Sequence, residues 1–299
     1  MRPVDVVVIG NVGIDTNVYF DSPDIDFAVE ANFTENLDCI GQAGGYAARG
    51  YVRLGFDTAF IGHVGDDFSG RFIRETFARD GIDTRALFTD PAGTARSVNF
   101  MYPDGRRKNF YDGKGHRALQ PDLEVCSSVL AGARLAHFNI PDWARRLLPL
   151  AKSAGVMVAC DLQDLVTLED PYRRDFIEAA DILFLSSANH PDPAPILRAL
   201  TRPGRIVVCG MGARGCALGT WEGVRFFPPV SLEASVVDSN GAGDSLAVGF
   251  LSSYVLEGSS LEDSLLKGQI AARHACSLKS DSSSLIRKAD LEQHFLGIR

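Results

Sequence analysis

Residues 236–244 read Val-Val-Asp-Ser-Asn-Gly-Ala-Gly-Asp and run directly into Ser245–Leu256, where apolar residues recur every three or four positions. This spacing predicts an amphipathic helix that ends near Gly258. Two glycines and an alanine at its start leave backbone N–H groups uncovered, and a helix N-terminus favours bound anions such as phosphate. The segment therefore predicts an anion-binding turn beside the carboxylate of Asp244. The alternative to a phosphate site is a plain tight turn, in which the carboxylate of Asp244 only interacts favourably with the helix dipole.

A second glycine-rich block lies far upstream. It reads Gly41-Gln-Ala-Gly-Gly-Tyr-Ala-Ala-Arg-Gly-Tyr-Val-Arg-Leu-Gly55 and is followed by Phe60-Ile-Gly-His-Val-Gly-Asp-Asp-Phe-Ser-Gly70. Gly44 and Gly45 open a predicted helix and leave room for a close approach of the backbone to a ligand.

Apolar runs rich in β-branched residues alternate with helical patterns along the chain. Six such runs predict strands: Val4–Ile9, Ala59–Gly62, Leu135–Asn139, Val156–Cys160, Ile182–Leu185 and Ile206–Cys209. Helical patterns such as Phe68–Arg79 and Trp143–Ser153 lie between most of them. This order predicts an α/β fold with a parallel sheet covered on both faces, and ligands at the carboxyl ends of its strands.

The region around residue 100 differs from the rest. Ser97–Tyr102 and Arg106–Tyr111 flank Pro103-Asp104-Gly105, which is turn chemistry between two strand-like runs. The region predicts a β-hairpin.

Composition narrows the class of partner. The chain has 299 residues, of which 45% are hydrophobic, enough for a large core, and its net charge of −8 disfavours nucleic-acid or anionic membrane partners. A small-molecule ligand is the remaining expectation. Six scattered cysteines without a Cys-x-x-Cys motif indicate reduced, buried thiols and neither a zinc site nor a disulfide framework. The chain opens on a predicted strand without signal-peptide features or a run long enough to span a membrane, so we expect a cytoplasmic protein.

The chain resembles the ribokinase-like (PfkB) carbohydrate kinases. The features that carry the resemblance are the two glycine blocks, the Leu-Gly pair at residues 54–55 that ends the predicted helix, and the Gly-x-Val-Gly-Asp-Asp-x-x-Gly turn at residues 62–70. The resemblance runs along the whole chain. It implies a single three-layer α/β/α domain over residues 1–299, with a mostly parallel central sheet and a small β-sheet lid built from segments 14–40 and 96–113. It also implies ATP and Mg²⁺ as cofactors. Because an uncovered sheet face or edge invites a partner, we further expect the lid strands to pair two subunits in a homodimer.

The expected reaction is phosphoryl transfer from ATP to a hydroxyl of a sugar, polyol or nucleoside. Such a transfer needs in-line positioning, stabilisation of charge on the phosphoryl group, and a group that accepts the hydroxyl proton. We predict that Asp244 is the general base. The N–H groups of Asn240, Gly241, Ala242 and Gly243 are predicted to bind the developing negative charge.

The resemblance assigns an acceptor site to the start of the chain. Asp15 and Asn11 would bind acceptor hydroxyls beside Gly44 and Gly45, whereas each of the two polar residues could instead cap its turn. Arg49 stands where the family usually has an asparagine, and its guanidinium suits a carboxylate or phosphate. It would then bind an anionic or unusually oriented acceptor, unless it is a surface arginine.

The resemblance also assigns a nucleotide site. Gly210-Met-Gly-Ala-Arg-Gly215 spells a dinucleotide-binding motif, but Cys216–Thr220 reads as a strand where that motif needs a helix. By resemblance, Gly210, Gly212 and Gly215 instead line the nucleotide, together with Asn240 and Cys276.

Two features concern metals. After the strand at residues 181–185 the family commonly carries Asn-x-x-Glu, whereas this chain has Ser186-Ser-Ala-Asn189. Magnesium would then be ordered by Asp161 or Asp164, or by phosphates and water alone. Asp238 resembles a segment that binds a monovalent cation such as K⁺ in some relatives, and a turn cap is its alternative role.

Two other functions stay open from the sequence. The missing carboxylate at residues 186–189 suggests a weakened kinase that acts as a ligand sensor, and the turn at Gly210 alone suggests a nicotinamide-dependent oxidoreductase. A phosphorylated acceptor is disfavoured, because Arg49, Arg107 and Lys108 are the only evident cations near the predicted mouth.

Overall fold

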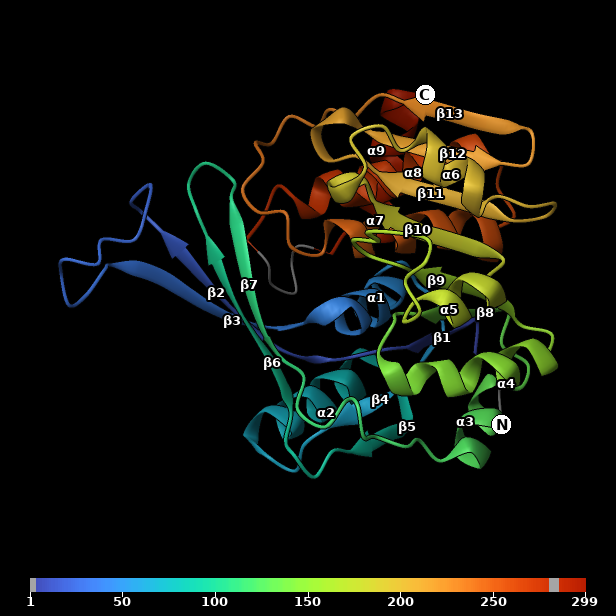
Figure 1. Ribbon diagram of the computed structural model, residues 1–299, viewed down its shortest axis with the longest axis horizontal. Coiled ribbons are helices and arrows are strands. Elements are labelled where there is room, and N and C mark those ends of the chain that lie inside the picture. The colour runs from blue at the N-terminus through green and yellow to red at the C-terminus, as the bar shows by residue number, and fades with distance from the viewer. Residues whose placement is uncertain (1–3, 280–284) are drawn as a thin grey trace.

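A computed structural model describes residues 4–279 and 285–299 of the chain (Figure 1). Within these residues, nine strands form a large sheet in the order β13-β12-β11-β10-β9-β8-β1-β4-β5. Their bounds are β1 Val6–Ile9, β4 Thr58–Val64, β5 Asp83–Thr89, β8 Leu135–Phe138, β9 Met157–Asp161, β10 Ile182–Ser186, β11 Ile206–Gly210, β12 Cys216–Thr220 and β13 Gly223–Phe227. Only the pairs β11–β12 and β12–β13 are antiparallel, which confirms the mostly parallel sheet.

The six predicted strands all coincide with strands of this sheet, because continuous apolar β-branched runs suit strands that are buried on both faces. Residues Cys216–Thr220 form β12, which returns antiparallel to β11. A strand after the glycine turn at residue 210 rules out the helix that a dinucleotide-binding motif requires. The predicted helix Phe68–Arg79 corresponds to α2 (Phe68–Asp80), and Trp143–Ser153 divides into a 3₁₀ turn and α4.

Helices cover both faces of the large sheet. Alternate residues of β1 separate the two layers: Val6 and Val8 face one cluster, and Val7 and Ile9 face the other. The first layer contains α1 Gln42–Arg53, α2, α7 Ala242–Leu251, α8 Leu261–Ala275 and α9 Lys288–Ile298. The second contains α3 Leu123–Leu130, η1 Asp142–Leu147, α4 Leu148–Ser153, α5 Arg174–Ala179 and α6 Ala194–Leu200. The three-layer α/β/α prediction is therefore confirmed.

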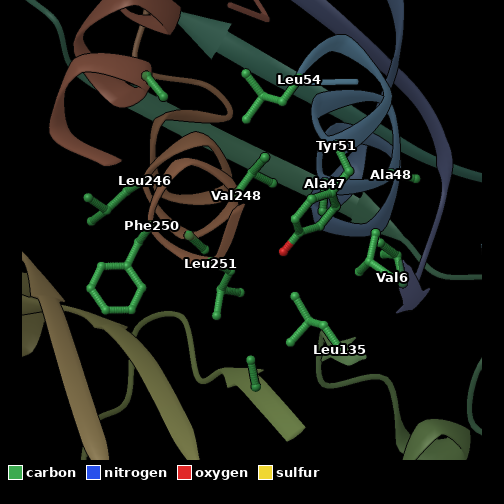
Figure 2. Close-up of a cluster of buried hydrophobic side chains, with 14 of the residues drawn as sticks. Val6, Ala47, Ala48, Tyr51, Leu54, Leu135, Leu246, Val248, Phe250 and Leu251 are labelled. Atoms are coloured by element: carbon green, nitrogen blue, oxygen red, sulfur yellow. The ribbon is translucent and has the colours of Figure 1, made fainter. Parts of the chain in front are cut away.

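Helices α1 and α7 pack against each other above the sheet (Figure 2). Tyr51 of α1 and Phe250 of α7 are fully buried in the same cluster. A side chain at Gly50 would come within 3.2 Å of Val248, so glycine there lets the helices approach closely. Helix α7 corresponds to the helix predicted over Ser245–Leu256. It begins slightly earlier, at Ala242, and the chain continues through the π-helical turn η4 (Ser252–Leu256). This packing holds the start of α7 beside the start of α1.

A second, four-stranded sheet projects from one side of the molecule (Figure 1). Its order is β3-β2-β6-β7, with β2 Gly13–Phe20, β3 Thr34–Gly41, β6 Ala95–Met101 and β7 Arg107–Asp112. Strands β6 and β7 form the hairpin that the turn residues predict, in the register Asn99 opposite Asn109. Since side chains alternate along a strand, one face of this sheet is turned to the large domain and the other away from it.

In the described parts of the chain, no helix has the length and apolar character needed to cross a membrane.

Candidate active site

A cleft of about 1190 Å³ lies where the small sheet meets the carboxyl ends of the large sheet's strands. Its walls come from β2, β6 and β7 of the small sheet, from the ends of β9, β10 and β11, and from the first turns of α1 and α7. Small-molecule sites typically measure about 300–1,000 Å³. The cleft is therefore large enough to hold two small ligands at once.

Asp244 lies in the first turn of α7, and its partly buried side chain lines the cleft. Burial raises the pKa of Asp244 well above its ordinary value, and the nearby carboxylates of Asp161 and Asp15 raise it further, whereas the charge of Arg107 acts in the opposite direction. A carboxylate in such an environment is a stronger proton acceptor when ionised than one in water.

The turn before α7 offers fewer open amides than the sequence predicts. The Asn240 N–H donates to Asp238 Oδ1 (2.8 Å), and the Ala242 N–H donates to the Ser239 carbonyl (3.3 Å). These two groups are engaged in shaping the turn, which corrects the expectation that all four amides of residues 240–243 are open.

The Gly241 and Gly243 amides donate no hydrogen bond within residues 4–279 and 285–299. Gly241 caps α7 in the left-handed conformation, with φ of 70°, and a side chain at Gly243 would meet no atom within 4 Å. Both glycines line the cleft beside Asp244. The open anion-binding groups are therefore the N–H groups of Gly241 and Gly243.

Asp15 of β2 also lines the cleft and is 5% exposed. Its Oδ2 accepts hydrogen bonds from the Gln42 N–H and the Tyr46 hydroxyl, each at 3.2 Å. Burial raises the pKa of Asp15, although these hydrogen bonds, the nearby Ser97 hydroxyl and the charge of Arg107 oppose the shift. Its Oδ1 is buried and has no hydrogen-bond partner in the described chain. One acceptor oxygen is thus available to a ligand.

Asn11 also lines the cleft, and its side-chain amide donates to the Tyr111 hydroxyl at 2.6 Å. The structure brings together Asp15 and Asn11, as expected, and adds a tyrosine that the sequence did not single out.

Gly44 and Gly45 do not line the cleft. A side chain at Gly44 would come within 2.4 Å of the Asn11 carbonyl, and one at Gly45 within 3.1 Å of Val12. Contrary to the expectation, these glycines allow α1 to pack closely on the chain after β1. The first turn of α1 faces the cleft through Gln42, Ala43 and Tyr46 instead. Gln42 has φ of 60°, and both polar atoms of its side chain are buried without a partner among the described residues.

Arg49 is likewise placed differently from the expectation. Its Nε donates to Asp80 Oδ2 at 2.8 Å, and the side chain is not part of the cleft wall. Asp80 is the last residue of α2, so the ion pair joins the α1 and α2 helices. The role of Arg49 is therefore structural, through its ion pair with Asp80. The α1 side chain that forms a hydrogen bond with Asp15 is that of Tyr46, almost one helical turn earlier.

Two further carboxylates, those of Asp161 and Asp164, line the cleft. Asp161 ends β9, and burial raises the pKa of its carboxyl to about 6. Asp164 lines the cleft and is ion-paired with Arg173 at 3.0 Å. No group of three or more His, Cys, Asp or Glu side chains able to hold a metal occurs among the described residues. Because Mg²⁺ is usually held by one or two carboxylates with phosphates and water, Asp161 is a residue that would fit a magnesium ion whose remaining ligands are phosphates and water.

Gly210, Gly212 and Gly215 line another part of the cleft, together with Cys276 at the end of α8. Gly212 and Gly215 have positive φ values of 57° and 90°, a conformation that favours glycine. Apolar parts of the wall come from Pro229, Val230, Val236 and Ala272, and the polar Gln269 and Arg273 also line the cleft. The sequence did not single out these residues because they are scattered over more than 40 positions. This part of the cleft is suited to a flat, largely apolar group such as a nucleotide base.

Asp238 is 2% exposed and is not part of the cleft wall. Its Oδ2 accepts a hydrogen bond from the Tyr19 hydroxyl at 2.6 Å, and its Oδ1 accepts from the Asn240 N–H. Oδ1 of Asp238 thus caps the turn, and Oδ2 joins the turn to the small sheet. These contacts match the turn-capping role that was the alternative to a cation site. Dependence on K⁺ stays a prediction from the resemblance.

The small sheet contributes a set of cleft residues of which the sequence analysis named only Arg107, as a cation near the predicted mouth. Its inner face presents Ser97, Asn99, Arg107, Asn109 and Tyr111, all at odd-numbered positions. The alternation within the predicted hairpin is the signal that could have grouped these residues, since odd and even positions lie on opposite faces.

Known proteins resemble this chain over most of its length. The chain matches the pfkB family of carbohydrate kinases over residues 5–288. It is 34% identical over 297 residues to the acarbose 7(IV)-phosphotransferase of Actinoplanes sp., covering 96% of this chain and 97% of the relative. It is 25% identical over 331 residues to the 5-dehydro-2-deoxygluconokinase of Geobacillus thermodenitrificans, covering 100% and 95%.

A solved structure shares the whole fold. The microbiome-derived acarbose kinase Mak1 superimposes with a TM-score of 0.89 at 30% identity, covering 99% of this chain and 100% of Mak1. Since the family match spans most of the chain and the relatives align over nearly their full length, the protein belongs to the pfkB family of carbohydrate kinases, enzymes that phosphorylate sugar hydroxyls.

Proposed function

We propose that this protein transfers the γ-phosphoryl group of ATP to a hydroxyl of a sugar or closely related polyhydroxylated acceptor, with Asp244 as the general base. The observation that carries the proposal is the arrangement of three features in one cleft. These are the Asp244 carboxylate, the open amides of Gly241 and Gly243, and the unpartnered oxygen of Asp15 within the described chain.

Each feature has a separate task in the proposed reaction. Asp15 Oδ1 accepts a hydrogen bond from one acceptor hydroxyl and orients the ring. Asp244 removes the proton from the hydroxyl that attacks phosphorus, and its desolvated position strengthens it as a base. The Gly241 and Gly243 amides stabilise negative charge that develops on the phosphoryl group. Magnesium, when bound through ATP phosphates and Asp161, supplies further neutralisation of that charge.

ATP is proposed to lie along the other half of the cleft, with its base among Val230, Val236 and Ala272 and beside the Gly210–Gly215 turn. From there its phosphates reach the start of α7, where the helix dipole favours negative charge.

The small sheet is proposed to act as a lid, with segments 14–40 and 96–113 covering the acceptor and excluding water. Its inner face is polar and lines the cleft. Its outer face presents Phe20, Phe100 and Phe110, whose rings contact one another at centroid distances of 5.2–5.3 Å. Because Phe110 is 51% exposed on an open sheet, we propose that a second copy of the chain covers this face.

The acceptor is proposed to be uncharged and larger than the smallest polyols. Asp15, Asp161, Asp164 and Asp244 line the cleft and disfavour a phosphorylated acceptor. The volume of the cleft and the similarity to an acarbose phosphotransferase support testing oligosaccharides and their analogues as well as single sugars.

The test is a coupled assay of ADP release with pentoses, hexoses, inositols, sugar acids, nucleosides and acarbose, using the wild-type enzyme and Asp244→Asn. We expect one acceptor class to be phosphorylated, and kcat of the variant to fall about 10²–10⁴-fold, the contribution typical of a general base.

Folding should survive the substitution. The pKa of Asp244 is raised from an ordinary 3.8, so the folded state binds the proton of this carboxyl more tightly than the unfolded state does. The contribution of Asp244 to the free energy of unfolding therefore declines as the pH rises above 3.8. At pH 7 the neutral Asp244→Asn variant should unfold at the same temperature as the wild type or higher. Full activity of this variant would contradict the role of Asp244. Binding of an acceptor without any ADP release by the wild type would favour the ligand-sensor alternative.

A further inference from the structure

The cleft has an excess of negative charge at the point where a phosphoryl group must pass. Asp15, Asp161 and Asp244 all line it, and the two acidic neighbours each raise the pKa of Asp244. Magnesium held through Asp161 would offset part of the repulsion between these carboxylates and ATP, and a protein cation at the same place would offset more of it.

Three arginines line the cleft within residues 4–279 and 285–299, and two of them bind other groups of the protein. Arg173 is ion-paired with Asp164 and Asp170, and Arg273 donates to the carbonyls of Leu232 and Ala234. Arg107 forms no ion pair among these residues and donates only to the side-chain oxygen of Asn240. Its positive charge is therefore available to a ligand.

Arg107 is also placed between the two halves of the proposed reaction. It extends from β7 of the small sheet to Asn240, the residue directly before the open Gly241 amide. Its charge acts on Asp15 and on Asp244, and it lowers the pKa of each. The Arg107 charge is therefore close enough to act on both the acceptor-side carboxylate and the base carboxylate.

A row of asparagines sets the position of β7 relative to the glycine turn. Asn109 donates to Asn99 Oδ1 (2.8 Å), and Asn99 donates to Asn17 Oδ1 (2.9 Å). The same Asn17 oxygen accepts a hydrogen bond from the Asn240 amide at 3.1 Å. This row crosses three strands of the small sheet and ends at the turn that Arg107 contacts. The guanidinium is thus held by the small sheet and by the large domain together.

We propose that Arg107 is a catalytic residue that the small sheet supplies, and that its guanidinium binds the phosphoryl group during transfer. The inference rests on the proposed kinase function. In the step, the acceptor oxygen forms a bond to phosphorus while the bond to the β–γ bridging oxygen breaks. ADP leaves with the electron pair, and the hydroxyl proton passes to Asp244. Arg107 stays protonated throughout and donates two hydrogen bonds to phosphoryl oxygens.

Arg107→Ala tests this role, with Lys108→Ala as the matched control. Lys108 is the next residue of β7, carries the same charge and does not line the cleft. We expect kcat of Arg107→Ala to fall about 10²–10³-fold, the typical loss when one transition-state donor is removed, with smaller changes in KM. Arg107→Lys should retain part of the rate, and Lys108→Ala should match the wild type.

A pH profile separates this role from a structural one. The groups that act on Asp244 are Asp161 of β9, Asp15 of β2 and Arg107 of β7. Removal of Arg107 leaves the two acidic neighbours unopposed, so the pKa of Asp244 rises. Because the base must be ionised, the acidic limb of kcat/KM should move to higher pH in Arg107→Ala and stay in place in Lys108→Ala.

A binding measurement keeps failure of this inference distinct from failure of the kinase assignment. With ADP, magnesium and fluoroaluminate, a mimic of a phosphoryl group in transfer, calorimetry should show tighter binding than with ADP and magnesium alone. Arg107→Ala should lose this gain and keep its affinity for ADP. The proposal is overturned if the gain survives, or if the substitution raises only KM for the acceptor, which would make Arg107 an acceptor-binding residue.

Discussion

The same residue type carries different tasks in this protein, and the local environment of each carboxylate decides which. Asp15 and Asp244 line the cleft, and burial raises the pKa of both. Asp67 lies in a glycine-rich turn that the sequence also singles out, and it caps α2 by accepting from the Gly70 N–H at 2.8 Å. Burial acts to raise the pKa of Asp67, but hydrogen bonds from Thr94 and Gly70 outweigh it and lower the pKa. Its role is to hold the turn.

At this scale we predict that Asp15→Asn weakens acceptor binding. The change replaces the carboxyl group with an amide, whose nitrogen cannot accept a hydrogen bond, and a hydrogen bond to a carboxylate contributes about 1.5–3 kcal/mol. KM for the acceptor should rise about 10- to 100-fold in steady-state kinetics, with a smaller loss in kcat. Asp38→Asn is the control, since Asp38 lies on β3 of the same sheet and bonds Thr16 outside the cleft. An unchanged KM for Asp15→Asn would place the acceptor elsewhere.

At the scale of elements, the start of α7 is what brings the catalytic groups together. The helix is buried from Ser245 to Leu251 and packs on α1 and α8, so its first turn cannot shift without disturbing the core. Gly241 precedes it at φ of 70°, which turns the preceding chain toward the small sheet. The open amides therefore depend on one backbone conformation that residues other than glycine rarely adopt.

We predict that Gly241→Ala reduces activity beyond its effect on stability, and Gly81→Ala provides the comparison. Both glycines have positive φ, of 70° and 80°, but only Gly241 lines the cleft, where the added carbon would lie 3.3 Å from the Tyr46 ring. Each variant should lose about 1 kcal/mol in free energy of unfolding, measured by denaturant titration. Only Gly241→Ala should also lose kcat, by roughly tenfold or more for a displaced donor. Equal activity of the two variants would argue against an anion-binding turn.

At the scale of the whole molecule, the cleft exists because two sheets meet. The large sheet supplies Asp161 and the glycine turn after β11, and the small sheet supplies Asp15 and Arg107. Neither sheet alone carries both halves of the site. The aromatic outer face of the small sheet, with Phe20, Phe100 and Phe110, belongs to neither hydrophobic core cluster of the large domain.

We predict a homodimer in which this outer face is covered. Sedimentation at micromolar concentration should give twice the monomer mass of 32.3 kDa for the wild type. Phe110→Asp should give a monomer, because a carboxylate would be buried in the interface without a partner. Phe226→Asp should stay dimeric, since Phe226 is similarly exposed (53% against 51%) but lies on β13 at the far edge of the large sheet. A monomeric wild type would refute the dimer.

Much of the fold was accessible from local patterns. Buried β-branched runs predicted the strands, and turn residues at 103–105 predicted the hairpin, because both depend on neighbours a few positions away. The position of Asp244 after two glycines at a helix start was readable for the same reason. The structural role of Arg49 could not be predicted in this way, because its partner Asp80 is 31 residues away and comes within reach only when α1 and α2 pack together.

The sequence by itself determined the family, the layered α/β architecture and the presence of a carboxylate beside a glycine-lined helix start, since each is encoded in short, contiguous segments. The tertiary structure alone decided which amides stay open, why Gly44 and Gly45 pack against the chain after β1, and that Arg107 reaches Asn240 across 133 residues. These outcomes depend on how the small sheet docks on the large one. Docking is set by many weak contacts between distant segments, which no local pattern records.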